Sequence, residues 1–176
     1  AKNSGNMVIA ITSQSYLGDL YKYQGKLSEA WKIYQEALEL ARLSNGNYLP
    51  AGGSALLGLG EIAYKRNQLE EAEQYLRKGL ELIGDWEISH FFGLSTTLAR
   101  VLIAQGDINE ATEWMHEAEN LAAQFDTTTM DDFIVGCRIA QLKLLIGNLD
   151  DVKEWKKSSH IFDQNSYQQT HRFSIF

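Results

Sequence analysis

Two segments of the chain place a glutamate and a histidine at the Glu-x-x-His spacing of carboxylate-bridged di-iron bundles. They are Glu87 to His90 and Glu113 to His116. Such a centre needs ligands that project inward from four helices. The helix expected around Glu113 carries its apolar stripe on another face, so Glu113 and His116 should face solvent. Glu87 falls near an expected loop, and we therefore predict no metal site.

Other reactive groups also have simpler structural explanations. The pairs Asp131-Asp132 and Asp150-Asp151 could bind a cation or act as acid and base, but they lie at expected helix starts, where the helix dipole favours acidic side chains. The single cysteine, Cys137, has apolar neighbours and no histidine in its own expected helix, which predicts a buried, inert thiol. We expect no catalytic residue, no metal and no cofactor in this chain.

The charge balance excludes a nucleic-acid-binding segment. The chain has 176 residues, with 16 Lys and Arg against 23 Asp and Glu and a net charge of −7. This leaves little positive potential for a phosphate backbone. No apolar run approaches the roughly 20 residues of a membrane span, and no signal-peptide core is present. These features predict a soluble cytoplasmic protein, and the ends of the sequence suggest a piece of a longer one.

One turn pattern occurs four times, at spacings of 42, 39 and 41 residues. Its first residue is Gly or Asn, which tolerate the left-handed conformation that ends a helix. An apolar residue follows two positions later and should pack back onto the first helix. An acidic residue then falls in the first turn of a second helix, followed by a small residue that lets two helices approach. The four copies are Gly25 to Ala30, Asn67 to Ala72, Gly106 to Ala111 and Gly147 to Val152.

This pattern, with a 3.6-residue apolar rhythm on both sides of each turn, predicts an all-α fold. We expect a right-handed superhelix of antiparallel hairpins spanning 1–158, followed by a linker and the start of a truncated helix at 159–176. The hairpins should cover 1–43, 50–83, 88–124 and 130–158. The predicted helices are 5–24, 27–43, 51–66, 69–83, 88–105, 108–124, 130–146 and 149–158.

The first hairpin resembles the tetratricopeptide motif, with Leu17, Gly18, Tyr21, Tyr34 and Ala37 at the motif's expected positions. The period of about 40 residues exceeds the usual value of about 34. Segments 59–64, 98–107 and 111–119 are similar to the repeat region of MalT-like, ATP-dependent LuxR-type transcription regulators. In that family the region lies between a nucleotide-binding module and a helix-turn-helix, and it can bind an inducing sugar. This segment has neither a phosphate loop nor a basic recognition helix. The resemblance therefore implies that DNA is bound by the C-terminal domain of the parent protein.

The tetratricopeptide resemblance implies that the first helix of each hairpin lines a groove. Its mixed donors, acceptors and aromatic rings would suit a small polar ligand or an extended peptide. The implied groove residues are Asp19, Lys22, Tyr23, Glu61, Tyr64, Lys65, Arg100 and Gln141.

Two functions remain open. The first is a sensor region that binds a small-molecule inducer or a partner protein and thereby controls a MalT-like regulator. The second is a general tetratricopeptide interaction scaffold, such as a co-chaperone or a peptide receptor. A clamp for acidic peptide tails needs several convergent cations, and only Lys22, Lys65 and Arg100 are candidates, which weakens the co-chaperone alternative.

Overall fold

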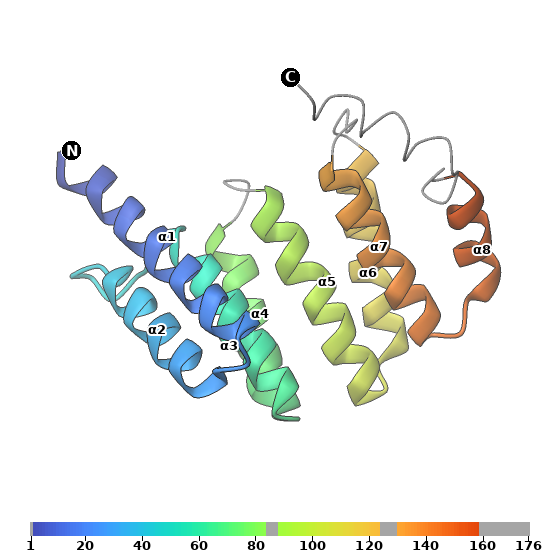
Figure 1. Ribbon diagram of the computed structural model, residues 1–176, viewed down its shortest axis with the longest axis horizontal. Coiled ribbons are helices and arrows are strands. Elements are labelled where there is room, and N and C mark those ends of the chain that lie inside the picture. The colour runs from blue at the N-terminus through green and yellow to red at the C-terminus, as the bar shows by residue number, and fades with distance from the viewer. Residues whose placement is uncertain (1, 84–87, 124–129, 159–176) are drawn as a thin grey trace, which may run out of the picture. The chain divides into compact units, whose positions relative to one another are not determined.

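The computed structural model describes residues 2–83, 88–123 and 130–158 of the chain (Figure 1). These residues form eight α-helices and no strand, with one isolated antiparallel bridge between Arg42 and Tyr48. The predicted all-α class is confirmed. Predicted and observed helix ends agree to within three residues. The helices are α1 (Lys2–Tyr23), α2 (Leu27–Leu40), α3 (Gly52–Lys65), α4 (Leu69–Ile83), α5 (Ile88–Gln105), α6 (Ile108–Ala123), α7 (Met130–Leu145) and α8 (Leu149–Ser158).

The four predicted turn residues all have left-handed backbone. Their φ angles are 75° at Gly25, 59° at Asn67, 90° at Gly106 and 83° at Gly147. In each turn the next residue donates its N–H to the carbonyl five residues earlier, at 2.9 Å. This bond is the Schellman closure of a helix C-terminus. Each hairpin therefore turns where the sequence predicts it, and by the predicted conformation.

The apolar residue after each turn is buried to a different extent in different hairpins. Leu27 packs against the core of the first hairpin. Ile108 and Leu149, in contrast, are 42% and 55% exposed, so the prediction that they pack back is wrong.

The chain divides into two compact units, residues 1–121 and 122–176. In the N-terminal unit α1 pairs with α2 and α3 pairs with α4, while α2 also packs on α3 and α4 on α5. The first helices also contact one another, α1 with α3 and α3 with α5. They therefore form a continuous layer. In the C-terminal unit α7 packs against α8. None of the described helices combines the length and apolar character needed to cross a membrane.

Tyr34 of α2 is the largest fully buried side chain of the N-terminal unit. Its ring lies against Gly18 of α1 and Gly58 of α3, and a Cβ atom at either glycine would collide with it. In the second hairpin the positions of Gly18 and Tyr34 hold Gly60 and Leu76, which are again in close contact. Because interiors are close-packed, a large side chain on one helix needs a small residue on its neighbour.

Candidate binding face on the first helices of the hairpins

The structure places seven of the eight predicted groove residues on three helices of the N-terminal unit. They are Asp19, Lys22 and Tyr23 on α1, Glu61, Tyr64 and Lys65 on α3, and Arg100 on α5. The eighth, Gln141, lies on α7 in the C-terminal unit and is exposed. We call the seven residues of the N-terminal unit the first-helix face.

Lys22 connects α1 to α3 on this face. Its Nζ donates hydrogen bonds to Asp19 Oδ1 at 2.7 Å and to Glu61 Oε2 at 2.5 Å. The Lys22 and Glu61 side chains are only 11% and 15% exposed. Burial by itself lowers the pKa of Lys22, but the attraction of Glu61 and Asp19 more than offsets it, so the net pKa is raised. Lys22 is therefore charged, and much of its bonding capacity is already used.

The buried Tyr34 of α2 forms a hydrogen bond with the group of Asp19, Lys22 and Glu61. Its hydroxyl donates to Asp19 Oδ1 at 2.7 Å. Burial raises the pKa of Tyr34, and the hydrogen bond to Asp19 raises it further. The core ring clamped by the two glycines thus also fixes the carboxylate that orients Lys22. The hydrogen bond from Tyr34 to Asp19 could not be predicted from the sequence. The motif places groove residues on the first helix of each hairpin only, and Tyr34 lies on a second helix.

Tyr64 and Arg100 connect α3 to α5 at equivalent positions of the repeat. Tyr64 follows Lys22 by 42 residues and Arg100 follows Glu61 by 39, which are the spacings of the hairpin turns. The Arg100 guanidinium carbon lies 5.1 Å from the centroid of the Tyr64 ring, a cation–π distance. The same two positions therefore join successive first helices, by an ion pair in one step and by a cation–π contact in the next.

Arg100 has no acidic partner among the described residues, although its Nε is buried. Lys65 and Tyr23 are exposed, and the Tyr23 side chain is 84% exposed. The first-helix face therefore contains two groups. Asp19, Lys22 and Glu61 bond to one another, whereas Tyr23, Tyr64, Lys65 and Arg100 retain surface or donors for another molecule.

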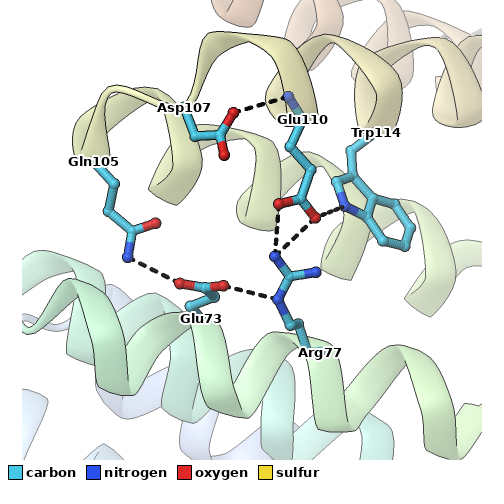
Figure 2. A network of polar contacts seen from close by, with 6 residues as sticks. All are labelled: Glu73, Arg77, Gln105, Asp107, Glu110 and Trp114. Carbon is cyan, nitrogen blue, oxygen red and sulfur yellow. Dashed lines mark hydrogen bonds and ion pairs between the residues drawn. The ribbon is translucent and has the colours of Figure 1, made fainter.

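A second polar network, formed by residues of α4, α5, α6 and the turn between α5 and α6, was not predicted from the sequence (Figure 2). Arg77 of α4 donates from Nε to Glu73 at 2.8 Å, and its Nη2 lies 2.7 and 2.9 Å from the two carboxylate oxygens of Glu110 on α6. Gln105, at the end of α5, donates to Glu73 at 2.9 Å. The i, i+4 pair of Glu73 and Arg77 can be read from the sequence, but Glu110 is 33 residues further along.

This network joins the second and third hairpins. Hydrogen bonds from Gln105 and Arg77 lower the pKa of Glu73. The Asp107 carboxylate accepts the Glu110 N–H at 3.1 Å, which is one half of the capping box that the sequence suggests. The Glu110 side chain binds Arg77 and Trp114 instead of reaching back. The Glu110 carboxylate therefore connects the third hairpin to Arg77 of the second.

Where the structure describes them, the other chemical candidates do not come together in one site. Glu113 and His116 are exposed on α6 as predicted, and in the described part of the chain no three His, Cys, Asp or Glu side chains group to hold a metal. Glu87 lies outside the described residues, as do the side chains of Asp131 and Asp132. Cys137 is half-buried and not buried as predicted.

Asp150 and Asp151 lie in the first turn of α8, as predicted. Asp150 pairs with Lys153 at 2.9 Å, and Asp151 pairs with Lys143 of α7 at 3.2 Å. Lysine contacts and the helix dipole therefore account for both carboxylates.

Comparison with known proteins agrees with this architecture. Residues 1–175 match the family model of the MalT-like TPR region. The HTH-type transcriptional regulator MalT of Yersinia pestis is 28% identical over 98 residues, which cover 56% of this chain and 11% of that protein. MalT of Vibrio cholerae is 26% identical over 141 residues, or 77% of this chain and 15% of that protein. The chain thus spans only a small part of these relatives.

Solved structures show the same fold. A crystal structure of a Podosopora anserina protein, described as a kinesin light chain with nearly identical TPR-like repeats, matches with a TM-score of 0.65. It is 16% identical in sequence, and the match covers 90% of this chain and 76% of that one. This likeness concerns the fold alone. Together, the repeat geometry and the match along residues 1–175 show that the chain belongs to the family of MalT-like tetratricopeptide regions.

Proposed function

We propose that this chain is a non-catalytic binding region that senses an inducer or a partner protein for a MalT-like transcription regulator. The observation that carries the proposal is the half-buried Arg100, which stacks on Tyr64 while its guanidinium has no acidic partner among the described residues. Buried donors without partners cost free energy, so a ligand that supplies acceptor oxygens would gain by binding there. In this proposal DNA binding belongs to another part of a cytoplasmic parent protein.

The chemistry of the first-helix face defines the ligand class. Arg100 and Lys65 offer donors to carboxylate, phosphate, carbonyl or hydroxyl oxygens, and Tyr64 and Tyr23 offer aromatic surfaces. The Asp19–Lys22–Glu61 group would act mainly as a rigid wall, because the Lys22 ammonium is already bonded to both carboxylates. A sugar or another small molecule rich in oxygen atoms fits this combination.

A peptide is the second candidate, and one observation favours it. Tyr23 and Lys65 occupy equivalent positions, 42 residues apart, on the neighbouring helices α1 and α3, and both are exposed. An extended peptide lying across the first helices could contact both side chains. The chain would then act as a general tetratricopeptide scaffold.

Isothermal titration tests the proposal with a panel of oligosaccharides, nucleotides and peptides. The variants Arg100→Ala and Tyr64→Ala should weaken binding by about 1 to 3 kcal/mol, which is roughly 5- to 150-fold in Kd. The controls Glu113→Ala and His116→Ala, both on exposed positions of α6, should bind like the wild type. Circular dichroism verifies that each variant folds. Equal affinities for all four variants would place the site elsewhere.

A further inference from the structure

The outer side of α1 carries a stripe of exposed apolar side chains. Ile9, Tyr16 and Leu20 are 65%, 63% and 53% exposed, and the neighbouring Leu17 is 39% exposed. Residues seven and four positions apart lie on one side of a helix, so these residues form one continuous surface. We call it the α1 stripe. Contiguous apolar surface of this kind marks an interaction site.

Most of the same positions are buried in the next two hairpins; the exception is His90 of the third hairpin, which corresponds to Ile9 and is half-buried. The positions of the second hairpin that correspond to Ile9, Tyr16, Leu17 and Leu20 are Ala51, just before α3, and Gly58, Leu59 and Ile62 of α3, and all four are buried. In α5, Thr97, Leu98 and Val101 correspond to Tyr16, Leu17 and Leu20, and all are fully buried.

The second helix of the preceding hairpin covers this face each time. Leu59 and Ile62 share a core cluster with Ala30, Tyr34 and Ala37 of α2. On α5 the equivalent face packs on α4, which approaches so closely that a Cβ at Gly79 would collide with Leu94. The α1 stripe is therefore the same interface with its second-helix partner missing.

We propose that the α1 stripe binds the second helix of a further tetratricopeptide-like hairpin, supplied by the same polypeptide ahead of α1. The established α2–α3 and α4–α5 interfaces set its geometry. The relatives, of which this chain covers 11% and 15%, are long enough to contain such a hairpin.

The stripe also predicts which side chain the covering helix carries. At the α2–α3 interface the large Tyr34 fits against Gly58. On α1 the position that corresponds to Gly58 is Tyr16. At the interface of the α1 stripe the large side chain is therefore on the first helix and not on the covering second helix. The covering helix should therefore carry Gly, Ala or Ser where α2 carries Tyr34, because close packing allows only one of the two to be large.

A second copy of the chain stacked end to end is a poorer occupant. Its last second helix, α8, carries Lys156 at the position of Tyr34. That arrangement would place an ammonium group against Tyr16 and Leu20, where desolvation of the charge is unfavourable.

Thiol labelling tests the proposal in the 176-residue chain and in the full-length protein that contains it. Tyr16→Cys, Leu20→Cys and Ile9→Cys are each made in a Cys137→Ser background, and iodoacetamide modification is followed by peptide mass spectrometry. We expect all three sites to react as exposed thiols in the 176-residue chain and at least tenfold more slowly in the full-length protein. Gln74→Cys, on the exposed side of α4, is the matched control and should change less than twofold.

Three outcomes would overturn the proposal. Equal labelling rates in the two proteins would show that nothing covers the stripe. Protection in the 176-residue chain that increases with its concentration would show that a second copy is the occupant. A covering segment that native mass spectrometry or cross-linking assigns to a different polypeptide would rule out the same-chain hairpin. Hydrogen exchange of the α1 amides in the unsubstituted proteins gives the same comparison without any variant.

Discussion

At the scale of single residues, Lys22 and Tyr34 determine the structure of the first-helix face. Lys22 binds the carboxylates of Asp19 on α1 and Glu61 on α3, and the buried Tyr34 donates a hydrogen bond to Asp19. Because the Lys22 and Glu61 side chains are largely buried, each charge depends on the other.

Lys22→Met should destabilise the N-terminal unit by about 1 to 3 kcal/mol, because it leaves the Glu61 carboxylate poorly solvated and without its partner. Urea denaturation followed by circular dichroism measures the loss. Adding Glu61→Leu to Lys22→Met should recover most of it. Arg42→Met removes the exposed pair with Glu39 and is the control, with an expected change below about 0.5 kcal/mol. A Lys22→Met protein as stable as the wild type would contradict the role of the pair.

Glu73 should make stability depend on acid. Its pKa in the folded chain is below the ordinary value of 4.5, so it contributes stability above about pH 4.5 that is lost as the pH falls through the folded-state pKa. The stability difference between wild type and Glu73→Gln should therefore shrink when the pH is lowered from 7 to 3. Denaturation at a series of pH values checks this. A stability difference that does not change with pH would mean that the hydrogen bonds from Gln105 and Arg77 do not lower the pKa of Glu73 in the folded chain.

At the scale of helices and turns, the sequence predicted most of the architecture. The four turn residues have the expected left-handed conformation because Gly and Asn adopt it readily, and that preference is local. Contacts between hairpins could not be predicted, because nothing local specifies which side chain meets which. The bond of Arg77 to Glu110 is of this kind. The bond of Tyr34 to Asp19, between the two helices of the first hairpin, could not be predicted for the same reason. The groove positions came from motif resemblance, and their use in binding stays a prediction.

Asn67 is the one described residue other than glycine with a positive φ, at 59°. Asn67→Ala should destabilise the second hairpin by about 1 kcal/mol, because a Cβ without a compensating polar group is disfavoured there. Asn67→Gly should be neutral or slightly stabilising. Thermal denaturation of the two variants measures the difference. Equal stabilities of the two variants would show that the left-handed conformation at residue 67 does not affect the stability of the second hairpin.

Ala72 and Ala111 are fully buried in the second helices of their hairpins. Ala72→Leu or Ala111→Leu should overpack the hairpin and destabilise it by about 1 to 3 kcal/mol. Gln74→Leu adds a side chain of the same size on the exposed side of α4 and should change stability little. Unchanged denaturation midpoints for the two alanine variants would refute the close helix contact.

At the scale of the whole molecule, stacking hairpins produces a layer of first helices whose side chains can act together. Packed helices lie about 8 to 10 Å apart, so one ligand can touch residues from α1, α3 and α5 at once. No single hairpin offers this surface. Repeat proteins commonly use such extended faces for binding, and among the described residues this face has the unsatisfied Arg100 Nε and the exposed Tyr23 ring.

Hydrogen–deuterium exchange with and without bound ligand tests the central claim most directly, namely that recognition uses the first helices. The ligand is whichever member of the oligosaccharide, nucleotide and peptide panel binds in the titration. We predict slower exchange in the C-terminal halves of α3 and α5, around Tyr64 and Arg100, with little change at the exposed positions of α6. Protection confined to α2, α4 and α6, with α3 and α5 unaffected, would contradict the account.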